Sequence, residues 1–156
     1  MIFRELQVPK PDSVHNFGDI PADTLEALRI IEPSLYGGPL KTVGRAAYLL
    51  GNLDDADGSF AAVPSMFAVP KGVAVVSRRD DETAWLQSLA VAPDARGDGV
   101  GTALLAHVER IARRWNLGRV GLLAIGDAII GYYEEHGYRT LNRGENNIVA
   151  ELYKEL

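Results

Sequence analysis

The alternation of apolar and polar residues is strongest between positions 83 and 115. The run Thr83–Val91 is mostly apolar and predicts a buried strand, which ends before Pro93 because proline cannot donate a hydrogen bond to a sheet. A glycine-rich turn follows the strand. Apolar residues then recur at helical spacing from about Gly99 to Trp115, which predicts a long amphipathic helix whose apolar face packs on the sheet.

The first part of the chain carries weaker patterns. Residues 1–8 alternate enough to predict a strand, and the polar, proline-bearing residues 9–18 predict a loop. A carboxylate cap at Asp23 predicts a helix, whose apolar stripe is interrupted at Pro33. A second helix is predicted over Thr42–Leu50.

The acidic segment 52–59, NLDDADGS, interrupts this helical region. Its aspartates suggest a calcium loop, but the glutamate required at the twelfth loop position is absent, so the segment predicts a solvated turn. Strands are expected after it at Met66–Val69 and Val73–Ser77. A charged turn at Asp80–Glu82 joins the second of these to the strand that ends at Val91, which predicts an antiparallel hairpin.

The last forty residues predict a strand, a helix and a final strand pair. The strand is Arg119–Ala124, and the helix runs to His136 with Asp127 as its cap. The final strands are expected near Tyr138–Leu141 and Asn147–Tyr153. This order of elements predicts one α+β domain over residues 1–156, with a mixed sheet covered by helices.

Composition and charge narrow the chemistry. The 156 residues include no cysteine, which excludes disulfides, thiolate metal sites and an acyl-enzyme on a thiol. The net charge of −5 argues against non-specific nucleic-acid binding and mildly favours a cationic substrate. Arg4 and Glu5 interrupt the apolar core that a signal peptide needs, and no apolar run is long enough to span a membrane, so a cytoplasmic protein is expected.

The turn Arg96–Gly101 has three glycines at alternate positions. Such a backbone adopts positive φ readily and exposes its N–H groups at a helix N-terminus, an arrangement that suits a phosphate or pyrophosphate. A P-loop would need a lysine before Thr102, and a dinucleotide-binding fingerprint would need a different glycine spacing near the start of a βαβ unit. The adhesion tripeptide Arg-Gly-Asp is discounted, because it recurs by chance and no export signal accompanies it.

Three segments in order resemble the GNAT superfamily of acetyl-CoA-dependent N-acetyltransferases. They are Leu89–Pro93 (L-x-V-x-P), Arg96–Gly101 (R-x-x-G-x-G) and Tyr132–Tyr138 (YYEEHGY). The resemblance covers about residues 65–153. It implies a mixed, mostly antiparallel sheet of about six to seven strands flanked by about four helices. It also implies that residues 61–156 bind the cofactor and that residues 1–60 shape the acceptor pocket.

The resemblance implies an enzyme that moves an acetyl group from acetyl-CoA to a primary amine of a small molecule, peptide or protein. Direct attack in a ternary complex is expected, with no metal. Tyr133 matches the family's general acid, because a phenol can donate a proton to a thiolate without prior ionisation. The residues that match the cofactor site are Leu89, Ala90, Val91, Arg96, Gly97, Asp98, Gly99, Val100, Gly101 and Thr102.

The chain departs from the family pattern at three positions. Gly126 stands where an asparagine commonly contacts the pantetheine arm, and Asp98 stands where relatives often carry a basic residue. Trp85 replaces a strand glutamate that some relatives use as the general base. Glu82 lies seven residues before Leu89, about 23 Å along an extended strand, and is too distant to substitute. The base is left open among water and the side chains of His15, Tyr36 and Tyr48.

These departures keep a second hypothesis open, a catalytically weak or inactive acyl-CoA-binding sensor or interaction module. A toxin that acetylates aminoacyl-tRNA would use the same fold but needs a basic face, which the acidic net charge disfavours. The acceptor amine is not identified by the sequence. A homodimer is compatible with the family resemblance, and no membrane partner is expected.

Overall fold

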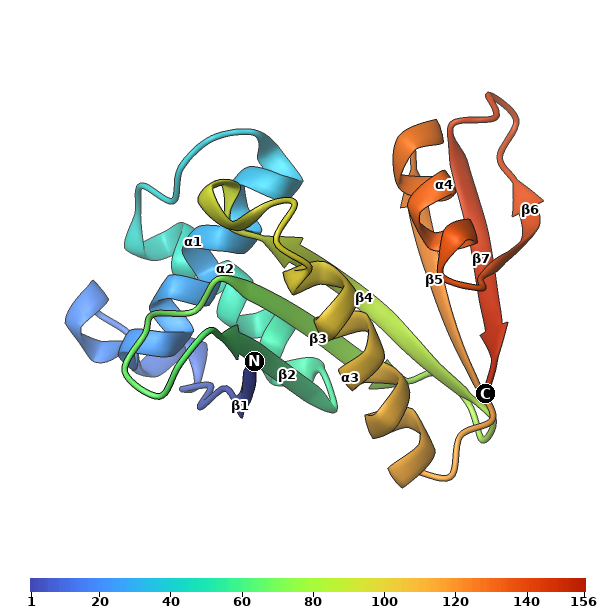
Figure 1. Cartoon of the computed structure of the whole chain (residues 1–156). Helices are drawn as coiled ribbons and strands as arrows, with labels where there is room; N and C mark the ends of the chain where they lie inside the picture. Colours follow the sequence, from blue (N-terminus) through green and yellow to red (C-terminus); the bar gives the residue numbers. More distant parts are fainter. The chain divides into compact units, whose positions relative to one another are not determined.

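The computed structural model describes residues 1–156 except for the side chain of Tyr36. The strands are β1 (Ile2–Glu5), β2 (Gly58–Val63), β3 (Gly72–Arg78), β4 (Thr83–Val91), β5 (Arg119–Ile125), β6 (Arg139–Arg143) and β7 (Val149–Glu155), and the helices are α1 (Ala22–Tyr36), α2 (Val43–Asp55), α3 (Val100–Arg114) and α4 (Asp127–Glu135) (Figure 1). Short 3₁₀ helices lie at Pro11–Ser13, Phe17–Asp19 and Pro93–Ala95. The predicted α+β class is confirmed.

The seven strands form one sheet in the order β1-β2-β3-β4-β5-β7-β6. β4 and β5 are parallel, whereas β1–β2, β2–β3, β5–β7 and β6–β7 are antiparallel. The predicted hairpin of β3 and β4 is present, since Ala92 N–H donates to Lys71 O and Arg79 N–H donates to Thr83 O. The prediction of a mixed, mostly antiparallel sheet is therefore confirmed.

The chain divides into two compact units. The first unit comprises Met1–Val76 and Ser88–His107, and the second comprises Ser77–Gln87 and Val108–Leu156. β3, β4 and α3 each contribute to both units. Each unit has its own apolar core.

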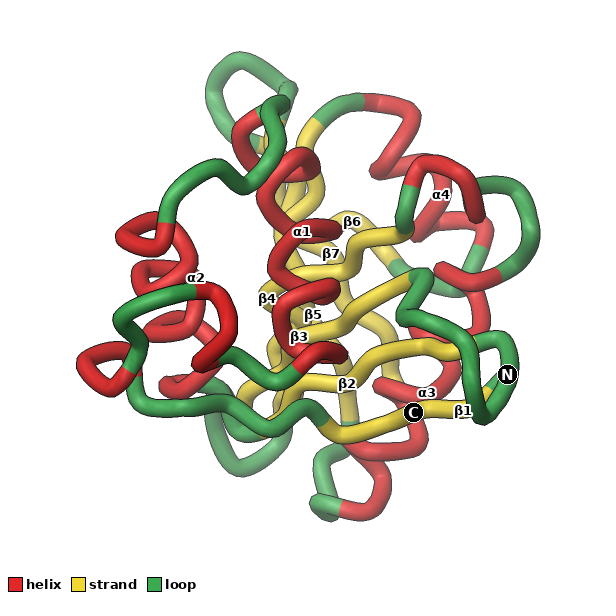
Figure 2. The backbone as a smooth tube through the Cα atoms, turned by 90° about the vertical axis from the view of Figure 1, so that its left-hand side faces the viewer, coloured by secondary structure: helices red, strands yellow, loops and turns green.

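The first unit packs helices on both faces of β1, β2 and β3. α1 and α2 lie on one face and the first half of α3 lies on the other (Figures 1 and 2). The largest fully buried side chains of this core are Leu28, Leu49, Leu50, Val63, Val73, Val76, Leu104 and Leu105. Gly72 permits a close approach of α3, because a Cβ atom there would lie 2.7 Å from Leu104 Cδ1 and from Val100 Cγ1.

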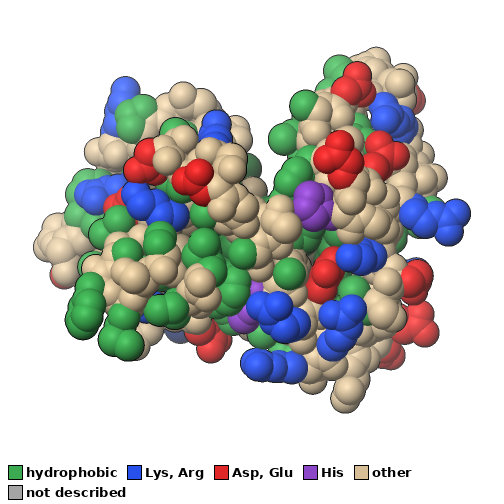
Figure 3. Space-filling model, in the orientation of Figure 1, with side chains coloured by type: hydrophobic (Ala, Val, Ile, Leu, Met, Phe, Trp, Pro, Cys, Tyr) green, Lys and Arg blue, Asp and Glu red, His purple; other side chains and the backbone are tan. Residues whose placement is uncertain are grey.

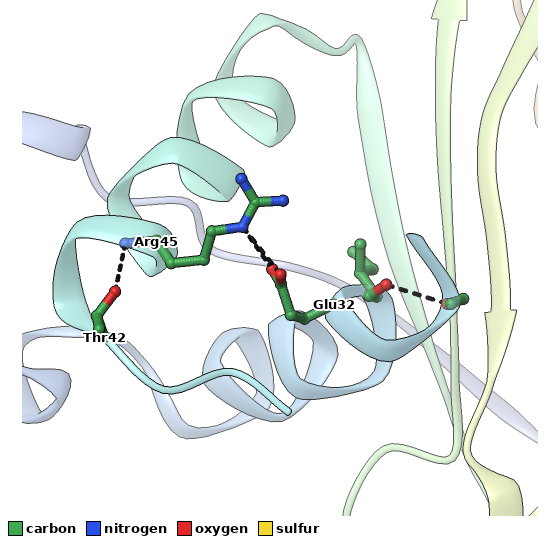
Figure 4. Close-up of polar contacts among 5 residues, drawn as sticks. Glu32, Thr42 and Arg45 are labelled. Carbon is green, nitrogen blue, oxygen red and sulfur yellow. Dashed lines mark hydrogen bonds and ion pairs between the residues drawn. The ribbon is translucent and has the colours of Figure 1, made fainter. Parts of the chain in front are cut away.

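A buried ion pair ties α1 to α2 (Figure 4). Arg45 Nε lies 2.9 Å and 2.8 Å from the two carboxylate oxygens of Glu32, whose side chain is only 8% exposed. Thr42 caps α2 by accepting a hydrogen bond from Arg45 N–H at 3.1 Å. A carboxylate this far from water needs such a partner, so the pair fixes how the two helices meet.

In the second unit, α4 packs against β5 and β6. Its core includes Val108, Leu122, Ile130 and Leu152, all fully buried. Glu109 is nearly buried and lies 2.8 Å from Lys154 Nζ, and it accepts a hydrogen bond from Tyr138 Oη at 3.3 Å. These contacts link α3 to β7 and to the segment after α4.

The strand predicted at Met66–Val69 is wrong. These residues form a turn, and the strand instead occupies Gly58–Val63, where every residue is buried. Met66 is 66% exposed and Phe67 is 96% exposed, and Figure 3 shows apolar side chains gathered at this turn. The prediction from apolar residues alone was therefore wrong, because a short apolar run does not show whether its side chains are buried.

Four predicted helix boundaries are also wrong. α1 begins at Ala22 with Pro21 as its N-cap, so Asp23 lies inside the helix and does not cap it. α1 continues through Pro33 to Tyr36, because a proline in the last turn removes only one hydrogen bond. α2 extends to Asp55, so the predicted acidic turn is partly helical. Gly126, not Asp127, is the cap residue of α4.

The close approach at Gly72 predicts the effect of a single methyl group. Gly72→Ala should lower the free energy of unfolding by about 1–3 kcal/mol, because Val100 and Leu104 must move away from β3. Gly44→Ala is the matched control: a Cβ at this helical position meets nothing within 4 Å, so helix propensity should raise stability by about 0.5–1 kcal/mol. Urea denaturation of both variants measures the difference, and equal effects would contradict the packing argument.

Candidate active site

The glycine turn before α3 has an open, left-handed backbone. Gly97 has φ 84° and Gly99 has φ 83°, as the sequence predicted, whereas Gly101 lies within the helix. A Cβ on Gly97 or Gly99 would meet nothing within 4 Å, so the backbone here is accessible. In the described part of the chain, no backbone carbonyl accepts from the amides of Gly97, Gly99 or Val100. The turn therefore presents N–H groups at the positive end of a helix dipole.

The end of β4 leads directly into this turn. The parallel register with β5 comprises Thr83–Leu86, and the predicted cofactor residues Leu89, Ala90 and Val91 follow it along β4. Arg96 Nε donates to Val91 O at 3.4 Å, which folds the first residue of the turn back on the strand. Both predicted cofactor segments, the strand end and the turn, belong to the first unit.

A salt bridge that the sequence did not indicate lies beside the turn. Lys71 Nζ is 2.8 Å from Asp94 Oδ2, and the hydrogen bond from this ammonium lowers the pKa of Asp94. Asp98 is exposed, and among the described residues it forms no ion pair. The Asp94 carboxylate beside the turn is therefore neutralised by a cation, whereas no ion pair is described for Asp98 in the turn itself.

Tyr133 lies in the second unit, on the buried side of α4. It is 7% exposed, and its ring makes edge contacts with Tyr132 at 5.3 Å and with Tyr138 at 5.6 Å. Burial, with a smaller effect of Tyr132, raises the pKa of Tyr133 above that of an ordinary phenol. The hydroxyl is therefore protonated at neutral pH. The glycine turn belongs to the first unit and Tyr133 to the second.

Gly126 has a backbone reason for departing from the family pattern. Its φ of 89° and ψ of 149° fall in a region that is essentially restricted to glycine. Its N–H donates to Ile148 O at 2.8 Å, and its carbonyl accepts from Ile130 N–H at 3.0 Å. An asparagine at this position would be strained, so the missing side chain follows from how α4 begins in this chain.

The candidate bases differ in their surroundings. His15 is exposed in a loop, where its backbone N–H donates to the Asp19 carboxylate. Tyr48 is 55% exposed on α2, and the Arg45 guanidinium carbon lies 4.7 Å from its ring centroid. The side chain of Tyr36 lies outside the described part of the structure. Glu82 is exposed in the hairpin turn before β4. None of these positions identifies a base.

Sequence reasoning missed a cluster around Trp85. Trp85 of β4 pairs with Gly121 of β5, which pairs with Tyr153 of β7. Arg79 lies over the Trp85 ring and contacts both Tyr153 and Glu151. The spacing of Glu151 and Tyr153, two residues apart in a strand, was the only available signal, since it places both on one face.

The carboxylate of Glu151 is held in its ionised form. It accepts a hydrogen bond from Tyr153 Oη and lies 3.3 Å from Arg79 Nη1. The Tyr153 hydrogen bond, followed by Arg79, lowers the pKa of Glu151. Burial, followed by the hydrogen bond to Glu151, raises the pKa of Tyr153. A carboxylate that is so readily ionised is a weak proton acceptor but a good partner for a cation.

The described residues include neither a metal-binding cluster nor a membrane-spanning helix. No group of three or more His, Asp or Glu side chains is arranged to hold a metal ion. None of the helices combines the length and hydrophobicity that a transmembrane span requires.

The sheet has one parallel pair, β4 and β5, and a glycine turn precedes α3. The family model described as the Acetyltransferase (GNAT) family matches residues 26–138, and the chain belongs to this family. By family it is therefore an acetyltransferase. No curated protein sequence matches the chain.

Solved structures of acetyltransferases share the fold. An aminoglycoside 6'-N-acetyltransferase complexed with coenzyme A has a TM-score of 0.75 at 13% identity, covering 99% of this chain and 97% of its own. A GNAT family acetyltransferase from Elizabethkingia anophelis with acetyl-CoA bound has a TM-score of 0.67 at 18% identity, with the same coverage. A chain of the NatC complex bound to Gag peptide and CoA has a TM-score of 0.68 at 18% identity, covering 99% and 98%.

The Glu151 interactions predict a pKa change. Tyr153→Phe removes the hydrogen bond that contributes most to the lowered pKa, so the pKa of Glu151 should rise toward its ordinary value of 4.5. A carboxyl with a lowered folded pKa adds stability above its unfolded pKa and loses it as pH falls through the folded value, so the variant should lose less stability below pH 4.5. Carboxyl NMR titration measures this pKa. Tyr132→Phe, which removes a tyrosine hydroxyl from α4, is the control. An unchanged pKa of Glu151 in Tyr153→Phe would contradict the prediction.

Proposed function

We propose that this chain is an N-acetyltransferase that transfers the acetyl group of acetyl-CoA to a primary amine by direct attack in a ternary complex. The open glycine turn at the start of α3 carries the proposal, together with membership of the family. Two of the structural neighbours described above contain coenzyme A and one contains acetyl-CoA, which supports the choice of cofactor.

In this proposal the backbone from Arg96 to Thr102 holds the phosphates. The open backbone at Gly97 and Gly99, the dipole of α3 and the guanidinium of Arg96 together fit a dianionic group. Main-chain groups of Leu89, Ala90 and Val91 would hold the pantetheine arm and the thioester carbonyl. The exposed Asp98 opposes this binding unless its carboxylate points to solvent.

Acetyl-CoA, when bound, supplies a thioester. The amine must be neutral when its nitrogen attacks the carbonyl carbon, and the carbon–sulfur bond then breaks. Tyr133 would give its proton to the departing sulfur, while the proton lost by the nitrogen passes to water. The raised pKa of Tyr133 keeps the phenol protonated until that step.

The acceptor is proposed to be a small molecule, a peptide or a protein that carries an amine. One structural neighbour is named for an aminoglycoside and another was solved with a peptide, so the fold accommodates both sizes. Residues 1–60 are proposed to shape the acceptor pocket within a single domain. A cytoplasmic location and a homodimer are also part of this proposal.

Trp85 favours a second candidate, an acyl-CoA-binding sensor with little activity. This bulky ring occupies a position where some relatives carry the general base. A sensor would bind acetyl-CoA without releasing thiol across a panel of amines. Because the chain has no cysteine, released coenzyme A is the only thiol in such an assay.

The role of Tyr133 predicts a loss of turnover. Tyr133→Phe should lower kcat by about 10²-fold or more and leave the acetyl-CoA dissociation constant within about twofold, since only the proton donor is removed. Tyr132→Phe, a neighbouring tyrosine on the same helix, should retain activity. Thiol release and calorimetric binding measure the two effects, and an unchanged kcat would remove Tyr133 from the mechanism.

The backbone of the turn predicts a selective loss of affinity. Gly99→Ala places a side chain at a φ of 83°, so the turn should distort and acetyl-CoA should bind about tenfold more weakly. Gly37→Ala is the control, because Gly37 has φ 75° at the end of α1 and equally open surroundings. Thermal shift at increasing acetyl-CoA measures both variants. The absence of any shift for the unmodified protein at millimolar acetyl-CoA would refute the proposed function.

A further inference from the structure

The aromatic rings of Trp85 and Tyr153 flank a glycine on one face of the second unit. Their centroids are 6.2 Å apart, and Gly121 lies between them in the register of β4, β5 and β7. A Cβ on Gly121 would lie 2.5 Å from the Tyr153 ring and 3.0 Å from the Trp85 ring. The absence of a side chain on the central strand is what allows both rings to lie there.

Arg79 places its guanidinium among these groups. The guanidinium carbon is 4.1 Å from the Trp85 ring centroid, within the range of a cation–π contact. Arg79 Nη1 donates to Tyr153 Oη at 2.9 Å and lies 3.3 Å from Glu151 Oε1. A π face, a hydroxyl acceptor and an ionised carboxylate therefore converge on one planar cation.

This set of groups is suited to binding a cation and not to accepting a proton. The Glu151 carboxylate already accepts the Tyr153 hydroxyl proton in a hydrogen bond, which stabilises its charged form. Arg119 is the other cation in contact, 5.1 Å from the Tyr153 ring centroid, and its Nε donates to Thr83 Oγ1 at 2.7 Å. Arg119 is thus tethered to β4, whereas Arg79 sits at the end of β3 with its side chain 46% exposed.

We propose that Trp85, Glu151 and Tyr153 form a binding site for an alkylguanidinium or alkylammonium group, and that Arg79 occupies this site in the free protein. Resting on the proposed function, the inference names the acceptor class: an amine that carries a second positive charge, which displaces Arg79. The net charge of −5 supports attraction of such a substrate.

Competition from Arg79 sets the expected affinity. A side chain tethered beside its site has an effective concentration in the millimolar range or above, so a free cation must outcompete it. The site should therefore bind weakly in the unmodified protein and more tightly once Arg79 is shortened.

Methylguanidinium chloride is the probe, and N-methylurea is its neutral counterpart of the same shape. At constant ionic strength and without acetyl-CoA, Arg79→Ala should bind methylguanidinium about tenfold more tightly than the unmodified protein, measured by NMR shifts of the Trp85 indole. N-methylurea should not bind. Arg78→Ala is the matched control, because it removes the same charge at the neighbouring position. The Arg78 guanidinium instead lies 4.8 Å from the centroid of the Trp115 ring.

The double variant Arg79→Ala, Glu151→Gln should lose the gained affinity. Equal affinity of Arg79→Ala, Arg78→Ala and the unmodified protein would overturn the proposal, as would equal binding of N-methylurea. If Arg79→Ala does not fold, Arg79→Gln replaces it with the same expected gain.

A kinetic comparison then tests the acceptor class. For the unmodified enzyme, kcat/KM should be about tenfold higher for 1,4-diaminobutane than for butylamine, and Glu151→Gln should bring the ratio close to one. An unchanged ratio in Glu151→Gln would overturn the assignment to the acceptor. Failure of the proposed function is distinguishable, because it appears as no thermal shift with acetyl-CoA and leaves the methylguanidinium result intact.

Discussion

The approach of α3 to β3 at Gly72 is the contact on which the candidate cofactor site depends. Because position 72 has no Cβ, the side chains of Val100 and Leu104 reach the sheet, and the first turn of the helix is fixed against it. The glycine turn joins the end of β4 to α3, whose position is fixed by this packing. Its left-handed residues make that short connection and leave their amides exposed.

The sequence predicted this half of the structure well because its signals are local. Residue type and spacing within one segment predict β4, the glycine turn and α3. The family motif also predicts a role for Tyr133, which lies at a fixed distance further along the chain. The failures are different in kind. Phe67 looks like a strand residue and is almost fully exposed, and Pro33 looks like a helix end and is not one. Both outcomes depend on tertiary packing, which local patterns do not contain.

The cluster at Trp85 was unpredictable for the same reason. It assembles Arg79, which follows β3, with residues of β4, β5 and β7, and its geometry depends on the register that places Gly121 between two aromatic residues. The substitution of Trp85 for a glutamate suggested only that a base was missing. The structure adds that the same face carries a carboxylate on another strand, already neutralised by an arginine. Trp85 and this carboxylate are thus separated by more than sixty residues in the sequence.

The buried pair of Glu32 and Arg45 has a consequence for the segment between α1 and α2. Both ends of this connection, residues 37–42, are anchored when the two helices are joined, so much of its conformational entropy is lost during folding. An anchored loop loses less conformational entropy when a ligand binds to it than a free loop does. The stiffness of the connection between α1 and α2 is therefore set by one ion pair.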